Sequence, residues 1–490
     1  MKKLIVYISI FATLLLTLSV VSQAADDDIF SSQQISVSGE IFGIQNADFN
    51  GDSLNDIALV IGEPSGERTL NIFLQRETGR FPPTISQRII LSHTVNMIQA
   101  ADLDGNGKSE ILVVNHQGVL LYSHDGEKFN DNPRMVINHP TIFTGGIKGS
   151  ILKQKFLYMI SGRLIAFVPV VDGFELFGYE NNHFAPVSQL GFSHAVYSAP
   201  NPVKLFIEKQ TIFSTIMPEV VISDYNKDDL ADVYVLWPTR LEIFPQNIRH
   251  EFSPTDKLTF NFSKYSRDNL CQSQLVDFDR DGILDLICIH SVGGLSEALT
   301  EVRFFGASQI LNNDKLERHL INLTDVCGNL IVGDFDGVGG PELVVTAIEL
   351  GILTTVKNMI SKKADFYFLV YPIDNLGRPA KEPKVRRKVT CRLDFEKADP
   401  TGDFCVNWSG DYNKDGFLDL VTADGEKMMF YRGVAEEYTE KKAGLVLDIA
   451  AVDHIITAQL NNDGNTDLIV IHKPGADSHK ITLLVTNRIY

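Results

Sequence analysis

The residues with the clearest potential for chemistry are the four aspartates of the stretch DFDRDGILDLICI, which begins at Asp277. They occupy positions 1, 3, 5 and 9 of the stretch, and an apolar, partly β-branched run follows them. Two unit charges about 4 Å apart repel each other by about 4 kcal/mol at an effective dielectric near 20. Four carboxylates within nine residues therefore predict a bound cation that offsets this repulsion.

The same pattern occurs six more times along the chain. The further copies begin at Asp48, Asp102, Asp224, Asp334, Asp411 and Gln459, and each precedes a short β-prone run. An alternative interpretation is that these stretches are only polar hairpin turns, since Asp, Asn and Gly favour turns. Seven copies with acids at matching positions favour cation binding over turns alone.

The spacing of the oxygen-bearing side chains predicts calcium. It resembles the first part of an EF-hand loop, in which alternate residues and a backbone carbonyl at position 7 direct oxygens at one Ca²⁺. A Gly at position 6 permits the sharp turn. Mg²⁺ fits less well because it requires strict octahedral geometry. A complete EF-hand is not expected, since the last acid stands at position 9 and β-prone runs follow the loops.

The acidity of the chain follows from the same loops. The formal net charge is −18, and the carboxylates at the four positions number 21 over the seven copies. A nucleic-acid-binding protein normally has a basic balance. We therefore expect no nucleic-acid partner and interpret the negative charge as ligand charge.

The distances between the copies predict the architecture. Successive copies begin 54, 122, 53, 57, 77 and 48 residues apart, and about 50 residues make one four-stranded antiparallel propeller blade. We expect an all-β fold in which residues 25–490 form a single closed β-propeller, with eight blades favoured and seven the runner-up. The longest gap predicts a degenerate blade at about 148–210, and the 77-residue gap predicts an insertion at about 355–390.

Residues 1–24 have the pattern of a secretory signal peptide. Lys2 and Lys3 precede an apolar stretch over residues 4–21, and Ser22 and Ala24 supply small residues at its end. The alternative is an uncleaved membrane anchor. We found no other span of 18 uncharged apolar residues. The mature protein is therefore expected to have no transmembrane segment and to be exported, either to the periplasm or outside the cell.

The cysteines and the known catalytic motifs add little. No CxxC pair occurs, so a zinc site is not expected. Cys271 could bridge to Cys288 and Cys391 to Cys405, or these residues could act as small buried apolar groups. The chain contains no GxSxG or HExxH pattern, and no catalytic residue is assigned.

Together with their following strands, the loops resemble the FG-GAP/VCBS repeats of integrin α-chain propellers and of many exported bacterial proteins. The resemblance covers about residues 31–490. It implies that the loops bind several structural Ca²⁺ ions through the side chains at positions 1, 3, 5 and 9 and the carbonyl at position 7. The candidate metal ligands are Asp48, Asn50, Asp52, Leu54, Asp56, Asp102, Asp104, Asn106, Lys108, Glu110, Asp224, Asn226, Asp228, Leu230, Asp232, Asp277, Asp279, Asp281, Ile283, Asp285, Asp334, Asp336, Gly340, Glu342, Asp411, Asn413, Asp415, Phe417, Asp419, Asn461, Asp463, Asn465 and Asp467.

Some copies depart from the pattern. Val338 stands at position 5 of its loop and Gln459 at position 1 of the last loop, so both loops lose a ligand. Ser53 and Asp229 stand where Gly is usual. We expect the loops that begin at residues 334 and 459 to bind Ca²⁺ most weakly, and the loop at Asp277 to bind it most tightly.

Two classes of function are compatible with this sequence. The first is an exported, calcium-stabilised binding or adhesion module whose partner is an extracellular or envelope protein, a glycan or another cell-surface component. The alternative is a calcium-dependent polysaccharide lyase, or another carbohydrate-active enzyme, on the same scaffold. Nine basic residues between Lys357 and Lys388 suggest a projecting hairpin for an anionic glycan, although a solvated loop is the simpler interpretation.

Overall fold

The computed structural model describes residues 29–143, 151–200, 211–253, 255–262, 270–292, 299–314, 317–323, 326–348, 352–392, 404–461, 463–473 and 479–486. Each apolar run that follows an acidic loop forms the second strand of a four-stranded antiparallel sheet. The strands β3 (Asp56–Gly62) and β7 (Glu110–Asn115) are buried at nearly every residue. These runs are apolar throughout, and do not alternate, because each strand is covered by neighbouring sheets on both faces.

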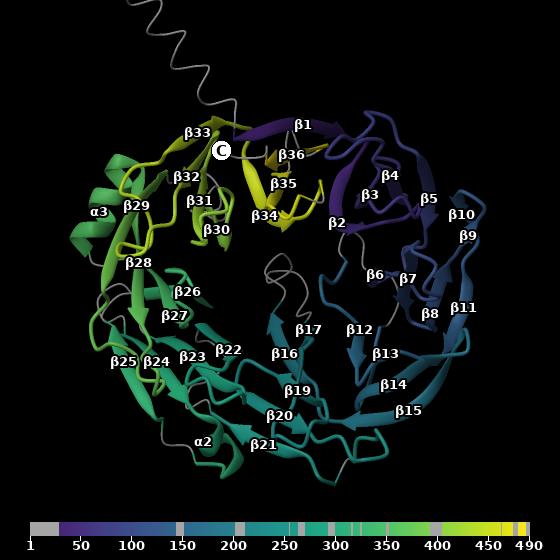
Figure 1. Ribbon diagram of the computed structural model, residues 1–490, viewed down its shortest axis with the longest axis horizontal. Coiled ribbons are helices and arrows are strands. Elements are labelled where there is room, and N and C mark those ends of the chain that lie inside the picture. The colour runs from purple at the N-terminus through teal and green to yellow at the C-terminus, as the bar shows by residue number, and fades with distance from the viewer. Residues whose placement is uncertain are drawn as a thin grey trace, which may run out of the picture.

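Eight such sheets form the blades of a propeller, arranged as a ring (Figure 1). The first four blades are β2–β5 (Glu40–Ala47, Asp56–Gly62, Arg68–Phe73, Gln87–Leu91), β6–β8 with β11 (Met97–Ala101, Glu110–Asn115, Gly118–Tyr122, Arg134–Asn138), β12–β15 (Leu157–Ile160, Arg163–Val170, Gly173–Glu180, His183–Gly191) and β18–β21 (Glu219–Ser223, Asp232–Leu236, Arg240–Phe244, Leu258–Asn261). The next three are β22–β25 (Leu270–Val276, Asp285–Val292, Leu299–Phe305, His319–Leu323), β26–β29 (Val326–Gly333, Glu342–Ile348, Lys363–Pro372, Val385–Arg392) and β30–β33 (Phe404–Gly410, Asp419–Asp424, Lys427–Tyr431, Leu445–Asp448). The eighth blade is β34–β36 (Val452–Ala458, Asp467–His472, Lys480–Thr486) completed by β1 (Phe30–Ser36).

The first and last strands of the described chain meet in one sheet. Strand β1 pairs antiparallel with β36, from Phe30 opposite Thr486 to Ser36 opposite Lys480. A buried apolar cluster joins each blade to the next, and the cluster between blades eight and one includes Ile35, Ile57 and Ile469. The prediction of an all-β propeller with eight four-stranded blades is therefore confirmed.

The expected degenerate blade lies over strands β12–β15, which form a regular sheet without an acidic loop. Two short hairpins stand outside the eight blades. One consists of β9 (His124–Asp125) and β10 (Lys128–Phe129), and the other of β16 (Ala195–Pro200) and β17 (Thr211–Ile216). The second hairpin follows the blade without an acidic loop and projects over the middle of the ring in the view of Figure 1. Residues 144–150 and 201–210 lie outside the described chain.

The insertion expected at about 355–390 needs correction. Only helix α3 (Ile352–Ser361) is added there to the four-strand pattern, because β28 and β29 are regular members of the sixth blade. A second short helix, α2 (Ala307–Leu311), follows β24. Neither of these helices, the two found in the described chain, has the length and hydropathy that a membrane-spanning helix requires.

The basic residues between Lys357 and Lys388 lie in the segment of α3, β28 and β29, so they are part of the sixth blade and do not form a separate hairpin. Lys388 pairs with Asp365 at 2.6 Å, and the buried Arg387 donates to the carbonyl of Thr439. These two side chains are therefore engaged within the blades, whereas the other seven basic residues of the segment are exposed.

Two other sequence predictions fall partly outside the described residues. The expected signal peptide over residues 1–24 lies entirely outside them. Cys391 and Cys405 are free thiols, so they do not form the bridge considered above. The side chain of Cys271 is not among those described.

Candidate metal centres

All seven acidic loops occupy the same place in their blades. Each one joins the first strand of a blade to the second, and its position-9 acid is the first residue of the second strand. Because the first strands of all blades run in the same direction around a ring, the seven loops lie at one end of the propeller.

In the six loops that begin with Asp, the backbone curls around the position-1 carboxylate. In the first loop, Gly51 and Ser53 at positions 4 and 6 have φ values of 82° and 66°, in the left-handed region. This turn directs backbone N–H groups inward, and Asp48 accepts hydrogen bonds from Asn50, Gly51 and Ser53 at 3.1, 2.6 and 2.7 Å. Asp229, at position 6 of the third loop, also has a left-handed φ of 63°.

The position-9 acids hold the backbone in addition to their predicted role as ligands. Asp56 is fully buried and accepts from the N–H of Phe49 at 2.9 Å through Oδ2 and from the N–H of Gln75 at 2.7 Å through Oδ1. One bond fixes position 2 of the loop, and the other fixes the segment after the third strand. The same pair of bonds occurs at Asp232, Asp285, Asp419 and Asp467.

Burial makes the ionised form of these acids costly. Burial, with a smaller contribution from nearby loop carboxylates, raises the pKa of Asp56 and of Asp285 to about 7. The pKa of Glu342 is also raised to about 7, chiefly by burial. The folded protein would therefore gain from a proton or a cation at this end of the blades.

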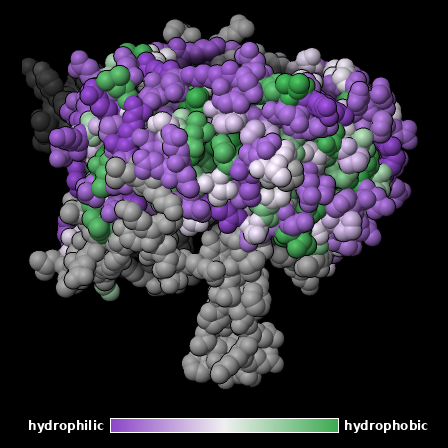
Figure 2. Space-filling model, turned by 90° about the horizontal axis from the view of Figure 1, so that it is seen from below, coloured by the Kyte–Doolittle hydropathy of each residue, from purple (hydrophilic) through white to green (hydrophobic). Residues whose placement is uncertain are grey.

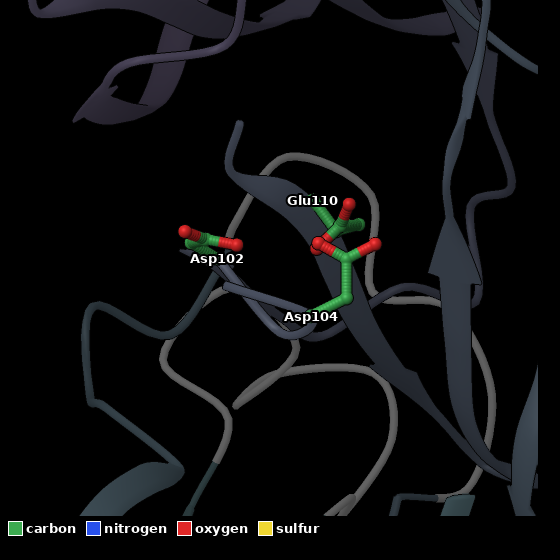
Figure 3. Close-up of side chains that lie close together, drawn as sticks. All are labelled: Asp102, Asp104 and Glu110. Carbon is green, nitrogen blue, oxygen red and sulfur yellow. The ribbon is translucent and has the colours of Figure 1, made fainter. Parts of the chain in front are cut away.

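Three of the loops bring their carboxylates together. Asp102, Asp104 and Glu110 each place an oxygen within 4.8 Å of the others, and Figure 3 shows the three side chains at one loop. The same convergence occurs among Asp277, Asp279 and Asp285, and among Asp334, Asp336 and Glu342. These are the three loops with Asp at position 3.

Unpartnered oxygens in the loops fit a cation. Oδ1 of Asp279, Oδ1 of Asp334 and Oδ1 of Asp411 are buried and have no hydrogen-bond partner. Buried acceptors are normally paired, and clustered carboxylate oxygens are the ligands that Ca²⁺ prefers. These residues could therefore hold a metal ion.

The four loops with Asn at position 3 are arranged differently. There the Asn amide donates to the position-5 carboxylate, as from Asn50 to Asp52 at 2.9 Å. The same contact occurs from Asn226 to Asp228, Asn413 to Asp415 and Asn461 to Asp463. In the last loop Asn465 also donates to Asp463, at 2.8 Å. These amides supply part of the neutralisation that a cation would otherwise provide.

The position-7 residues orient position 5 through their backbone. The N–H of Leu54 donates to Asp52 at 2.9 Å, and that of Ile283 donates to Asp281 at 2.8 Å. The equivalent bond occurs at Lys108, Leu230, Phe417 and Asn465. No such bond is present at Gly340, because position 5 of that loop is Val338.

Contacts between loops and from outside them were not predicted. Ser109 N–H donates to the Asp48 carbonyl at 2.7 Å, and Asn55 Nδ2 donates to the Gln459 carbonyl at 2.9 Å. Arg318 forms an ion pair with Asp279 at 2.5 Å. These partners come from other blades or from far along the chain, so the repeat pattern carries no signal for them.

A polar pocket of about 560 Å³ lies between the third and fourth blades. Its lining includes Asp172, Gln189, Arg240 and Lys257. At its base the buried Glu242 accepts from Lys257 Nζ at 3.0 Å and from the indole of Trp237 at 3.2 Å. The pocket thus combines two cationic side chains with acidic and amide groups.

Residues 48–144, in the first two blades, match a family model described as FG-GAP-like repeat. No curated protein matches the chain in sequence. Among solved structures, the chain is similar to a non-reducing terminal N-acetylglucosamine-recognising lectin of Agrocybe aegerita, with 15% identity over 92% of this chain and 98% of that one and a TM-score of 0.39. It is also similar to the rhamnogalacturonan lyase PL11 of Bacillus licheniformis, with 13% identity, coverage of 94% and 77%, and a TM-score of 0.38. A third similar structure is BBS1N in complex with ARL6DN, with 9% identity, coverage of 94% and 98%, and a TM-score of 0.37.

The family match lies on two of the seven acidic loops, and the other five have the same position between strands. The chain is therefore an eight-bladed β-propeller that carries FG-GAP-like repeats.

Proposed function

We propose that this protein is an exported, calcium-stabilised binding module. The observation that carries the calcium part of the proposal is the convergence of three carboxylates in each of three loops, with buried oxygens of Asp279 and Asp334 left without a partner. A hard cation with six to eight oxygen ligands would satisfy these groups.

The role of calcium in this proposal is structural. When bound, the ion supplies positive charge to the position-1, position-3 and position-9 oxygens and so neutralises their mutual repulsion. The chain's own residues do the rest: the position-1 acid folds the loop, and the position-9 acid ties it to the third strand through bonds such as Asp56 to Gln75. Bound Ca²⁺ would therefore stabilise the junction between the first two strands of each loaded blade.

The binding part of the proposal rests on the polar pocket between blades three and four. Its volume of about 560 Å³ lies within the range of small-ligand sites. Gln189 offers hydrogen-bond donors, and Asp172 offers an acceptor at the rim. Arg240 and Lys257, which both pair with Glu242, keep N–H groups beyond those used in that pairing. This mixture suits a hydroxyl-rich ligand such as a glycan. The side of the molecule that Figure 2 shows is largely hydrophilic, as suits a partner outside the cell.

Calcium can be tested directly. Protein purified without chelator is expected to contain several equivalents of calcium by elemental analysis, and EGTA is expected to lower its Tm. A Tm that does not respond to EGTA, together with the absence of bound metal, would refute the calcium proposal.

Glycan binding needs a separate test. Affinity electrophoresis against neutral and acidic polysaccharides is expected to show retardation that Lys257→Met reduces and Lys128→Met, a distant exposed control, does not. Retardation by no polysaccharide and capture of no envelope protein would count against a binding module. Ultraviolet-absorbing unsaturated products in the same incubations would instead support the lyase alternative.

A further inference from the structure

One of the three carboxylate clusters already contains a cation from the protein itself. Nη1 of Arg318, which lies just before β25, is 2.5 Å from Oδ2 of Asp279, the position-3 residue of the loop that begins at Asp277. Its Nη2 donates to the carbonyl of Leu376 at 2.8 Å. The side chains of Arg318 and Asp279 are only 31% and 16% exposed, so solvent screens this ion pair less than a surface pair.

The segment that contains Leu376 packs directly on the loop. Ile373 and Pro379 pair as an isolated β-bridge at the base of this turn. A Cβ on Gly377 would lie 2.6 Å from the ring of Phe278 and 2.8 Å from Cβ of Asp279, which leaves room only for glycine. Arg318 therefore connects the loop of the fifth blade to a turn of the sixth blade that covers it.

The other two clusters have no such ion pair at position 3 among the described residues. Asp104 and Asp336 occupy the same position in their loops and converge with their neighbours in the same way. Within the described ranges, neither of these two carboxylates forms an ion pair with a basic side chain. The matched loops thus differ in whether an arginine supplies positive charge at position 3.

We propose that Arg318 is an internal counter-cation of the loop at Asp277, which keeps this loop folded without calcium and weakens its affinity for calcium. The inference rests on the proposed calcium function. Oδ1 of Asp279 remains buried and without a partner, so the loop keeps a free oxygen for an ion. The guanidinium on Oδ2 repels a second cation, so the loop with the most carboxylates binds Ca²⁺ less tightly than the loop at Asp102, contrary to the expectation from ligand count.

Hydrogen–deuterium exchange during a calcium titration tests this inference loop by loop in the full-length protein. In the wild type with EGTA, the peptide over residues 277–285 is expected to stay more protected than the peptide over residues 102–110, and this comparison needs no variant. Arg318→Met is expected to remove that protection in EGTA. It is also expected to lower the calcium midpoint of the 277–285 peptide by roughly tenfold, the effect of one nearby unit charge in a water-like dielectric.

Arg378→Met is the matched control, since it removes the same charge from the covering turn and breaks only an exposed pair with Asp374. An unchanged calcium midpoint in Arg318→Met, or an equal shift in Arg378→Met, would overturn the inference. Loss of protection that saturating calcium fails to restore would also overturn it, since Arg318 would then have only a packing role. If calcium does not change the hydrogen–deuterium exchange of the 102–110 peptide either, the proposed calcium function itself fails.

Discussion

Replacing Asp104 by Asn is expected to stabilise the protein without calcium and to destabilise it with calcium. The carboxylates of Asp102, Asp104 and Glu110 lie within 4.8 Å of one another, so the change removes two of three repulsive pairs. Each pair costs about 1 kcal/mol at a water-like dielectric, so the gain in EGTA is about 2 kcal/mol. At the same dielectric, a Ca²⁺–carboxylate contact near 2.4 Å contributes about 3–4 kcal/mol, which exceeds the repulsion that is relieved.

Thermal unfolding in EGTA and in saturating Ca²⁺ gives the sign of the stability change under each condition. We expect Asp104→Asn to raise the Tm by about 1–3 °C in EGTA and to lower it by a similar amount in calcium. Asn50→Asp is the reverse change in the first loop, where it removes the hydrogen bond that the Asn50 side-chain amide donates to Asp52 and adds a carboxylate. It is expected to lower the Tm in EGTA.

A change of the same sign in both buffers for Asp104→Asn would refute the reasoning, because the carboxylate would then act through packing or local hydrogen bonds. The backbone N–H of Asn106 donates to Asp104 at 3.1 Å. In the Asp104→Asn variant, the side-chain oxygen of the new Asn can still accept this hydrogen bond. A sign inversion therefore reports the charge at this position.

Three further predictions concern the calcium-free and calcium-bound forms. In the folded protein the pKa of Asp56 and of Asp285 is raised from 3.8 to about 7. Their contribution to stability is therefore fully present below pH about 4 and is lost as the pH rises through 7. Urea unfolding in EGTA should show this decline in the unfolding free energy, and calcium should make the decline smaller. Asp229→Gly should be more stable than Asp229→Ala by about 1 kcal/mol, since φ at this residue is 63°; equal stabilities in urea would show that no strain is present. At pH 5 in EGTA, Asp419→Ala should lower the unfolding free energy by about 2 kcal/mol through the buried N–H groups it leaves unpaired. Asp415→Ala, at an exposed residue, should change the unfolding free energy by less than about 0.5 kcal/mol. Similar losses in both variants would contradict the role of Asp419 in holding the backbone.

The architecture could be predicted because the repeat pattern is local and periodic. The nine-residue loops mark the junction between the first and second strands of a blade, and their spacing predicted the number of blades. The blade without a loop was placed by the length of the gap alone, and strands β12–β15 occupy it. The gap predicted an insertion but not that it is the helix α3, because chain length does not distinguish a helix from a longer hairpin.

The internal chemistry of the loops was less predictable. The pattern treats Asp and Asn at position 3 as equivalent ligands, but Asn50 bonds to Asp52 whereas Asp104 joins a carboxylate cluster. The double hydrogen bonding of Asp56 depends on Gln75, 19 residues away. The ion pair of Arg318 with Asp279 depends on a residue 39 positions away that lies outside the acidic loops. Such contacts are set by tertiary packing, which a local pattern does not encode.

The pairing of β1 with β36 has a consequence for how the chain folds. The hydroxyl of Ser31 donates to the carbonyl of Val485, a contact that spans 454 residues. Bringing two segments together across so many residues carries a loop-closure entropy cost of about 5 kcal/mol if the intervening chain is unfolded. The cost falls once the intervening blades have stacked, because the two ends are then held near each other. Sealing the ring is therefore expected to be the last step of folding, and until β1 pairs the hydrogen-bonding edge of β36 is open to intermolecular association.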